Sequence, residues 1–311
     1  MENDKCKVCV LMSTYNGEKY LEEQINSVLA QKDCQVQLIV RDDGSSDRTI
    51  EILQKYHEAG WLEYYTGENL KPAKSFMNLL YNAPQAEFYA FCDQDDIWMP
   101  EKLVEAIKML QGRKNVSSNN VLLYFSNLID VDANNTLLKE RHLENHVYTD
   151  LQSILVRCSW IFGCTQVFTY ELKELVKQSY HPKKQPMHDI WVAMICAMYG
   201  EIVYDDRSFI HYRQHGRNVV GAQLSFNAKL RSRWTRLIRG NEISIATNAK
   251  SLLIIAKEKE LSDGKCKVLY LVADYKKSIY TKLRYICRTN IFKQPKKRAF
   301  FEIFLILLGK E

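Results

Sequence analysis

This sequence lacks three features, and each absence excludes a class of protein. No apolar run reaches the roughly 18 residues that a bilayer-spanning helix needs. Residues 1–7 are polar and the first apolar run, 8–12, has only the length of a strand, so we expect no signal peptide. The nine cysteines are scattered, and Cys6 and Cys9 have no second pair at zinc-finger spacing. We therefore expect reduced, mostly buried thiols in a cytosolic protein.

The length and composition fit one large α/β domain, with or without an appendage. The 311 residues are 46% hydrophobic, which is ample for a core. The net charge of +6 is unevenly placed, because residues 229–311 hold 20 Lys and Arg against 7 Asp and Glu, whereas residues 1–228 hold 23 against 30. An acidic body with a basic tail suggests that the tail meets something anionic, such as phospholipid, nucleic acid or an acidic polymer.

Strand-sized apolar runs alternate with helical patterns in the first third of the chain. Strands are predicted at 8–12, 36–40, 61–65 and 88–92, and helices at 20–29, 49–56 and 74–81. This alternation implies right-handed crossover units and a mainly parallel sheet flanked by helices. Ligands bind such sheets outside the carboxyl ends of the strands. The polar loops at 13–17, 41–47 and 93–96 should therefore converge on one crevice.

Three carboxylates, those of Asp93, Asp95 and Asp96, come directly after the predicted strand at 88–92. Like charges this close repel one another and lose hydration at the edge of a core, so a cation is needed to compensate them. Mg²⁺ is the simplest candidate, because it takes one or two protein carboxylates together with substrate phosphates. The alternative is a solvated strand end before a helix, where acids suit the helix dipole and Pro100 suits a first turn. This stretch alone leaves both interpretations open.

The remainder of the acidic body continues the pattern. Strands are predicted at 121–125, 202–204 and 209–212, and helices at 102–110, 170–178 and 188–198. Gly163 interrupts an apolar segment, which suits a close approach of the backbone to a neighbouring group. His188 and Asp189 open a helix and could simply cap it. Taken alone, the loop at 213–218 is typical of a solvated turn.

The basic tail is predicted to be helical, with segments at 226–239, 244–259, 268–288 and 293–310. In the last of these, Lys296, Lys297 and Arg298 precede the apolar run 300–308. This run is too short to span a bilayer but long enough to lie in its interface, with basic residues for anionic headgroups. The alternative is a helix that packs on the body. A nucleic-acid surface is disfavoured, because the aromatic residues group with aliphatic ones.

Five motifs in register resemble the family 2 glycosyltransferases of the GT-A fold. They are Ser13-Thr14-Tyr15-Asn16-Gly17, Asp42-Asp43-Gly44-Ser45-Ser46-Asp47, Asp93-Gln94-Asp95-Asp96 with Trp98 and Pro100, His188-Asp189, and Tyr212-Arg213-Gln214-His215. More narrowly, the sequence resembles the bacterial rhamnosyltransferase-type members. The resemblance covers about residues 1–222. It implies a Rossmann-like α/β catalytic domain at 1–222 and a helical, basic, membrane-associating extension at 223–311.

The resemblance also implies roles for individual residues. Asp189 matches the catalytic base, which takes the proton from the acceptor hydroxyl in one inverting displacement. Asp93, Asp95 and His215 would hold Mg²⁺ or Mn²⁺ on the donor diphosphate. The nucleotide sugar would contact Thr14, Tyr15, Asn16, Asp42, Asp43, Lys74, Asp93, Asp96, Arg213 and Arg217. The sugar or acceptor side would include Trp98, Gly163, Cys164, Thr165, His188 and Trp191.

We therefore expect a metal-dependent glycosyltransferase of cell-surface polysaccharide synthesis. The expected donor is a dTDP- or UDP-sugar, with rhamnose favoured, and the expected acceptor is a glycan or lipid-linked glycan. We expect a cytoplasmic protein, peripheral on the inner face of the plasma membrane, with no nucleic-acid partner. The alternatives are transfer from a UDP-hexose and a metal-dependent sugar nucleotidyltransferase. The stretch Tyr15-Asn16-Gly17-Glu18 does not match the Gly-rich phosphate loop expected of the latter.

One position departs from the family pattern. Lys71 stands where glycine is usual, in the segment Gly67 to Phe76 before the third predicted helix. A turn that needs a positive φ would be more costly with lysine than with glycine. The donor preference that this loop would otherwise indicate is therefore left open.

Overall fold

The computed structural model describes residues 5–114, 119–144, 146–157, 160–179, 181–182, 186–214, 244–289 and 296–309. The chain divides into two compact units. The first contains Met1–Thr149, Ser159–Gln178 and Met187–Asn218, and the second contains Asp150–Cys158, Ser179–Pro186 and Val219–Glu311. None of the helices in the described ranges is long and apolar enough to cross a membrane.

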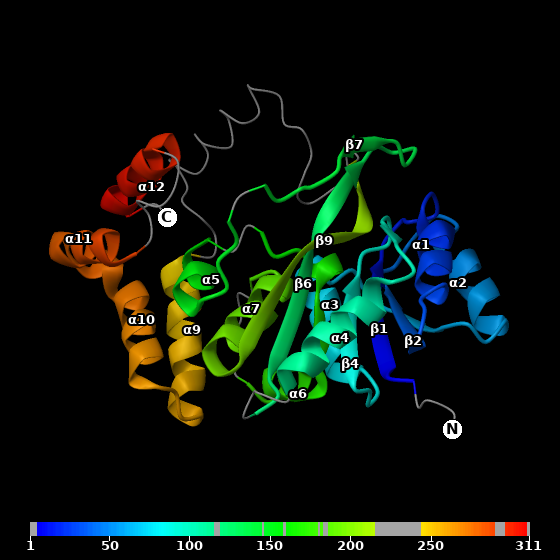
Figure 1. Ribbon diagram of the computed structural model, residues 1–311, viewed down its shortest axis with the longest axis horizontal. Coiled ribbons are helices and arrows are strands. Elements are labelled where there is room, and N and C mark those ends of the chain that lie inside the picture. The colour runs from blue at the N-terminus through cyan, green and yellow to red at the C-terminus, as the bar shows by residue number, and fades with distance from the viewer. Residues whose placement is uncertain are drawn as a thin grey trace. The chain divides into compact units, whose positions relative to one another are not determined.

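The first unit is built on a mixed sheet whose N-terminal half is parallel (Figure 1). This half has the order β3-β2-β1-β4, and all three of its pairings are parallel. Its strands are β1 (Lys7–Thr14), β2 (Gln35–Asp42), β3 (Glu63–Thr66) and β4 (Phe88–Cys92). Thr14 pairs with Asp42 and Met12 pairs with Cys92, so the three central strands end at one edge. The predicted parallel arrangement and its strands are confirmed.

The other half of the sheet contains antiparallel pairings that the sequence did not predict. The order continues β4-β8-β6-β9-β5, and only the pairing of β6 with β9 is parallel. These strands are β8 (Val167–Thr169), β6 (Leu122–Val131), β9 (Glu201–Arg213) and β5 (Ile97–Trp98), with β7 (Leu137–Lys139) paired to β6. Because Ile97 pairs with His211, the loop at 93–96 lies beside the end of β9.

Strand β9 corrects one prediction, since the two short strands expected at 202–204 and 209–212 are one continuous strand. The polar residues between them resemble a turn in the sequence. In the structure, Arg207 binds the carboxylate of Asp205 with its Nε and Nη2 atoms, and Asp205 also accepts a hydrogen bond from the Tyr124 hydroxyl. These contacts satisfy the charges within the sheet, and the irregular register opposite Ser126 to Ile129 accommodates them.

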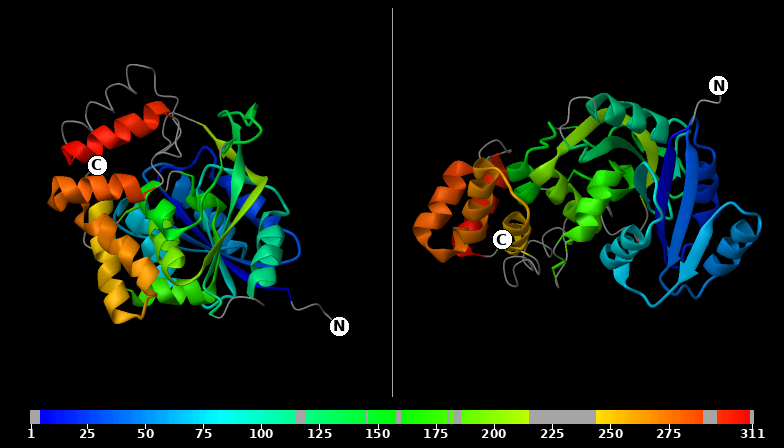
Figure 2. Two further views of the ribbon diagram at one scale, coloured as in Figure 1. Left: turned by 60° about the vertical axis from the view of Figure 1, so that its left-hand side comes forward. Right: turned by 90° about the horizontal axis from the view of Figure 1, so that it is seen from below.

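Helices cover both faces of the sheet (Figure 2). One face packs against α1 (Leu21–Leu29), α2 (Thr49–Glu58) and α4 (Lys102–Lys114), whose buried side chains share a core cluster with Val8, Val10 and Met12. The alternate residues of β1 and β4 point to the other face. There Phe76 of α3 (Lys71–Asn82) packs on Phe91, beside α6 (Tyr170–Gln178) and α7 (His188–Tyr199). Strands buried on both faces explain the continuous apolar runs.

The second unit is helical. Its described helices are α5 (Leu151–Arg157), α9 (Ile245–Glu258), α10 (Asp263–Asp274), α11 (Ile279–Arg288) and α12 (Lys296–Leu308). The predicted helix at 268–288 is divided into α10 and α11. Ser278 starts α11 with a capping box, in which its hydroxyl accepts from Thr281 N and the Thr281 hydroxyl accepts from Ser278 N. The predicted helix at 226–239 lies outside the described residues.

Candidate active site

The three polar loops at the carboxyl ends of β1, β2 and β4 are joined by hydrogen bonds. Gln94 accepts a hydrogen bond from Tyr15 N (2.8 Å) and donates from Nε2 to Tyr15 O (3.2 Å). Asn16 links the first loop to the second, because its N donates to the Ser45 hydroxyl (2.9 Å) and its Oδ1 accepts from Ser46 N (2.8 Å). The predicted convergence of the three loops is confirmed.

Asp42 is buried at the end of β2 and organises the second loop. Its Oδ1 accepts from the Thr14 hydroxyl (3.0 Å), and its Oδ2 accepts from the backbone of Gly44 (2.9 Å) and Ser45 (2.8 Å). Gly44 has a φ of +78°, a conformation that favours glycine. In this structure the carboxylate of Asp42 is therefore engaged by the chain itself, and nucleotide contact by Asp42 or Thr14 remains a prediction.

Asp43 connects the same loop to the start of α3. It forms a buried ion pair with Arg41, and its two oxygens accept from the Ser75 hydroxyl (2.7 Å) and Leu70 N (3.0 Å). Just beyond, Lys71 has a φ of +66°. The backbone turn that the sequence analysis considered does have a positive φ. Lysine adopts this left-handed conformation at a higher free-energy cost than glycine. Lys74 is exposed on α3, and Tyr15 is 48% exposed.

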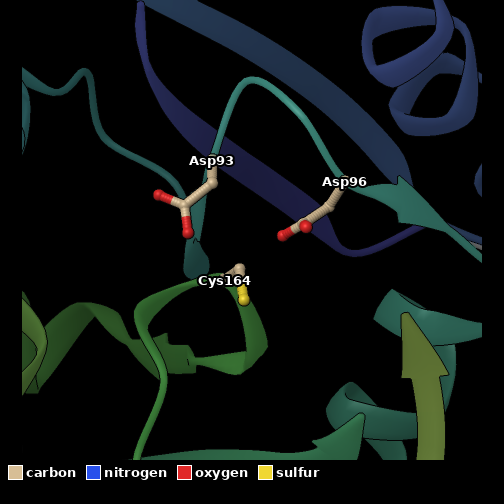
Figure 3. Close-up of side chains that lie close together, drawn as sticks. All are labelled: Asp93, Asp96 and Cys164. Atoms are coloured by element: carbon tan, nitrogen blue, oxygen red, sulfur yellow. The ribbon is translucent and has the colours of Figure 1, made fainter. Parts of the chain in front are cut away.

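The acidic residues after β4 form a cluster with a cysteine (Figure 3). One carboxylate oxygen each of Asp93 and Asp96 and the sulfur of Cys164 all lie within 4.8 Å of one another. Asp96 is 0% exposed. Its Oδ1 accepts from Arg213 N (3.2 Å), whereas its Oδ2 accepts no hydrogen bond from any residue that the structure describes. Asp95 lies between the two in sequence and adds a third carboxylate to their surroundings.

Crowding of buried carboxylates strongly disfavours their charged forms. Burial, together with the negative charges of Asp95 and Asp189, raises the pKa of Asp93 to about 7. Burial and the charges of Asp95 and Asp93 raise the pKa of Asp96 well above its usual range. The oxygen donors of this cluster are hard and crowded, and that of Asp96 is buried and not fully hydrogen-bonded, which matches what a divalent cation requires. The cluster thus fits a metal ion better than the alternative of a solvated strand end.

Arg213 holds the acidic loop at 93–96 in place. It is 2% exposed, and its guanidinium donates to Asp95 O (2.9 Å), to Ala133 O (3.0 Å) and to Glu23 of α1 (2.6 Å). The guanidinium also lies over the Tyr20 ring, 4.4 Å from its centre. We interpret Arg213 as a residue that positions the acidic loop. The other two residues predicted in this motif, His215 and Arg217, lie outside the described residues.

Asp189 is the second residue of α7, and its carboxylate is held by backbone donors. Its Oδ2 accepts from Gly163 N (3.1 Å) and its Oδ1 from Ile190 N (2.8 Å), while Gln166 Nε2 donates to its carbonyl oxygen (3.0 Å). Burial raises the pKa of Asp189 to about 6, and the backbone hydrogen bonds oppose this shift. The negative charge of Asp189 contributes to the raised pKa of Asp93, so the two carboxylates influence one another. The raised pKa of Asp189 suits a general base near neutral pH.

Three residues predicted on the sugar or acceptor side are in the interior. His188 stacks on Phe76, with ring centres 4.0 Å apart, and neither of its ring nitrogens has a partner among the described residues. Burial lowers the pKa of His188 to about 3, so the imidazole is neutral. Trp191 is 0% exposed, and Trp98 is covered by Lys102, whose Nζ lies 3.6 Å from the centre of the Trp98 ring. We interpret His188, Trp98 and Trp191 as packing residues.

The short 3₁₀ helix η1 (Gly163–Thr165) carries the remaining predicted residues and is where sequence reasoning missed a contact. The hydroxyl group (2.8 Å) and the backbone N (3.0 Å) of Thr165 both donate hydrogen bonds to Phe162 O. These bonds fix Cys164, which lies between the two residues. The sequence did not associate Cys164 with the acidic cluster. The only local signal was Gly163, where an added Cβ would lie 2.7 Å from His188 Nε2.

Comparison with known proteins agrees with this fold. Residues 9–164 match the model of the Glycosyl transferase family 2, and this is half of the chain, so the chain belongs to that family. A relative from Shigella flexneri, named dTDP-rhamnosyl transferase RfbG, is 27% identical over 72% of this chain and 81% of its own length. An Escherichia coli relative, the UDP-Glc:alpha-D-GlcNAc-diphosphoundecaprenol beta-1,3-glucosyltransferase WfgD, is 30% identical over 43% of this chain and 50% of its own length.

Solved structures share the fold. The crystal structure of S. aureus TarS 1-349 in complex with UDP has a TM-score of 0.54 and 20% identity, covering 93% of this chain and 77% of that one. The mannosyltransferase PcManGT from Pyrobaculum calidifontis, in complex with GDP-Man and Mn²⁺, has a TM-score of 0.52 and 14% identity, covering 98% and 86%. The predicted α/β fold of the GT-A type with C-terminal helices is confirmed.

Proposed function

We propose that the protein is an inverting glycosyltransferase in which Asp189 is the general base. The observation that carries this proposal is the carboxylate of Asp189, which is held by Gly163 N and Ile190 N and whose charge acts on Asp93. As the acceptor hydroxyl oxygen attacks the anomeric carbon, its proton passes to Asp189, and the bond from that carbon to the nucleoside diphosphate breaks. One displacement suffices, and no covalent enzyme intermediate forms.

The acidic loop would hold the divalent ion of such a transferase. Asp93 and Asp95 are the proposed ligands for Mg²⁺ or Mn²⁺, with His215 as a further one. When bound, the ion neutralises negative charge on the leaving diphosphate. Arg213 keeps the loop in place through Asp95 O and the Asp96 carboxylate, and Gln94 ties it to Tyr15. We propose that the nucleotide lies over the loop of Thr14, Tyr15 and Asn16, with Lys74 and Arg217 near its phosphates.

The relatives support a nucleotide-sugar donor and a cell-envelope glycan as acceptor. The name of the Shigella relative favours a dTDP-rhamnose donor, whereas those of WfgD and of the TarS complex favour a UDP-sugar. We propose the rhamnosyl donor first, because the RfbG similarity extends over most of both chains. A UDP-hexose is the second candidate. The proposed acceptor is a lipid-linked or polymeric glycan of cell-surface polysaccharide synthesis.

We further propose that the second unit associates with the inner face of the plasma membrane. Large apolar side chains of α11 and α12 are exposed, namely Ile279, Tyr280, Leu283, Phe300, Phe304, Leu307 and Leu308. Lysines and arginines of both helices lie close to these residues in sequence. Apolar groups beside cationic ones suit an interface with anionic lipid. Deletion of residues 293–311 should reduce the fraction of protein that pellets with anionic vesicles, and unchanged pelleting would contradict this part of the proposal.

A donor screen tests the proposed reaction. Full-length protein is mixed with dTDP-rhamnose, UDP-glucose, UDP-GlcNAc or GDP-mannose, with Mn²⁺, Mg²⁺ or EDTA, and its thermal midpoint and the release of nucleoside diphosphate are followed. We expect stabilisation and slow hydrolysis with dTDP-rhamnose and a metal. A response to UDP-glucose alone would favour the hexose donor. Stabilisation by no nucleotide sugar, or hydrolysis that is unchanged by EDTA, would contradict the proposed metal-dependent transferase.

A further inference from the structure

The Asp93, Asp96 and Cys164 cluster contains a sulfur donor, which Mg²⁺ and Mn²⁺ do not prefer. The ligand atoms of the three residues lie within 4.8 Å of one another, and Figure 3 shows the side chains of Asp93, Asp96 and Cys164 close together. Soft sulfur ligands favour Zn²⁺ and related thiophilic ions, whereas Mg²⁺ favours oxygen alone. The presence of Cys164 therefore changes which cations this pocket can hold.

Two further observations indicate a preformed site. Asp96 is fully buried, and its Oδ2 accepts no hydrogen bond from the described residues, although its Oδ1 is fixed by Arg213 N. Cys164 is a free thiol that is 1% exposed and interacts with Asp93 and Asp96, and it lies in η1 between Gly163, which donates to Asp189, and Thr165, which donates to Phe162 O. A buried oxygen without a donor, facing a fixed thiol, gives a cation two ligands with little rearrangement.

We propose that Asp93, Asp96 and Cys164 form a binding site for a thiophilic divalent cation, Zn²⁺ or Cd²⁺. On binding, a sulfur–metal bond forms at Cys164, and the thiol proton passes to the buffer. Because Asp93 is also a proposed ligand of the catalytic ion, a thiophilic ion in this site competes with Mg²⁺ or Mn²⁺. The site itself is inferred from the proximity and burial of these side chains and does not depend on the proposed sugar transfer.

The positive charge of one neighbouring residue opposes cation binding. Removing that charge should therefore strengthen binding, which is a directional test of the proposal. Lys102 is fully buried, and its Nζ has no hydrogen-bond partner among the described residues. Its charge acts on both Asp96 and Cys164. A second positive charge in this region is repelled by the ammonium group. Replacement of Lys102 by methionine, which has a similar length and no charge, should therefore strengthen cation binding.

The experiment titrates metal-free, full-length protein with Cd²⁺ and follows the ultraviolet absorption of the thiolate–cadmium bond, without donor or acceptor. We expect Cys164→Ser to weaken the tightest Cd²⁺ equivalent by at least about tenfold. Asp96→Asn should weaken it by a similar factor, although that variant keeps all nine cysteines. Lys102→Met should tighten it several-fold, a result that misfolding could not imitate. Cys287→Ser, which removes an exposed thiol of α11, is the matched control and should leave this equivalent unchanged.

The outcomes separate this site from binding to other thiols. If Cys164→Ser and Asp96→Asn both leave the tightest equivalent unchanged, or if Cys287→Ser abolishes it, the proposal is overturned. If Cys164→Ser loses the tightest Cd²⁺ equivalent but Asp96→Asn keeps it, the thiol binds Cd²⁺ without this carboxylate. That result would also overturn the proposal. Failure of the donor screen would leave these measurements unaffected, so the failure of one proposal can be distinguished from that of the other.

Discussion

The backbone N–H of Gly163 donates to Oδ2 of Asp189 across 3.1 Å and so couples the 3₁₀ turn η1 to the start of α7. His188, the neighbour of Asp189, fills the space beside Gly163 so closely that a Cβ there would lie 2.7 Å from its Nε2. Behind it, Phe76 and Phe91 enclose the imidazole ring. The position of the proposed base is therefore set by a glycine and by a buried, neutral histidine.

Gly163→Ala should lower the turnover rate more than it raises KM for the donor. The methyl group must displace His188 or the η1 backbone, and either movement shifts Asp189, whereas the donor loops at 13–17 and 41–47 are held by other contacts. Misplacement of a catalytic group by about 1 Å can reduce the rate on the order of 100-fold. Gly112→Ala on α4, where an added Cβ meets nothing within 4 Å, is the matched control and should retain activity. Equal activity of the two variants would argue against this positioning role.

Transfer should accelerate as pH rises through about 6. Asp189 acts as a base only when ionised, and its pKa is raised to about 6, so the rate should rise roughly tenfold per pH unit below that value and level off above it. Asp189→Asn should lower the plateau by at least about 100-fold and remove this limb of the profile. The measurement is the initial rate of transfer at saturating donor, as a function of pH, for the wild type and for Asp189→Asn. A wild-type limb centred near pH 4 would exclude Asp189 as the titrating group.

The same carboxylate should reduce stability at neutral pH. An ordinary aspartate has a pKa of about 3.9 in the unfolded chain, whereas that of folded Asp189 is raised to about 6. Between these values the native state retains a proton that the unfolded state has lost, so stability falls as pH rises through the window. Asp189→Asn should therefore melt at a higher temperature than the wild type at pH near 7, with a smaller difference at pH near 4. If the difference in melting temperature between Asp189→Asn and the wild type does not increase from about pH 4 to about pH 7, the raised pKa of Asp189 is contradicted.

Arg213→Met should weaken donor binding and destabilise the first unit. The buried guanidinium donates to the backbone oxygens Asp95 O and Ala133 O and to the half-exposed carboxylate of Glu23, so its loss removes three hydrogen bonds and frees the acidic loop. Each hydrogen bond contributes on the order of 1 kcal/mol, so the expected loss of stability is about 2 to 3 kcal/mol. Arg48→Met, which removes an exposed pair with Glu51, should change stability by less than about 1 kcal/mol. Urea unfolding and donor titration test both variants, and similar effects for the two would contradict the role assigned to Arg213.

The sequence predicted contacts that follow from periodic patterns, and it missed those that depend on tertiary pairing. Parallel strands end at a common edge, so the approach of Gln94 to Tyr15 follows from strand order alone. The association of Asp96 with Cys164 joins distant segments with no shared local pattern. Strand β9 was divided in two because Asp205 and Arg207 resemble a turn until their mutual ion pair is known. Likewise, the motif identified Arg213 but not Glu23, its partner on α1.

Lys71→Gly should stabilise the protein. Lys71 has a φ of +66°, where a side chain with a Cβ is strained by roughly 1 to 2 kcal/mol and glycine is not. Glycine loses more backbone entropy on folding, so the expected net gain is about 1 kcal/mol or less. Lys74→Gly, three residues further along and inside α3, is the matched control, because the same substitution in a helix interior should cost about 1 kcal/mol. The two variants should therefore shift the urea midpoint in opposite directions, and a shift in the same direction would contradict the left-handed conformation at Lys71.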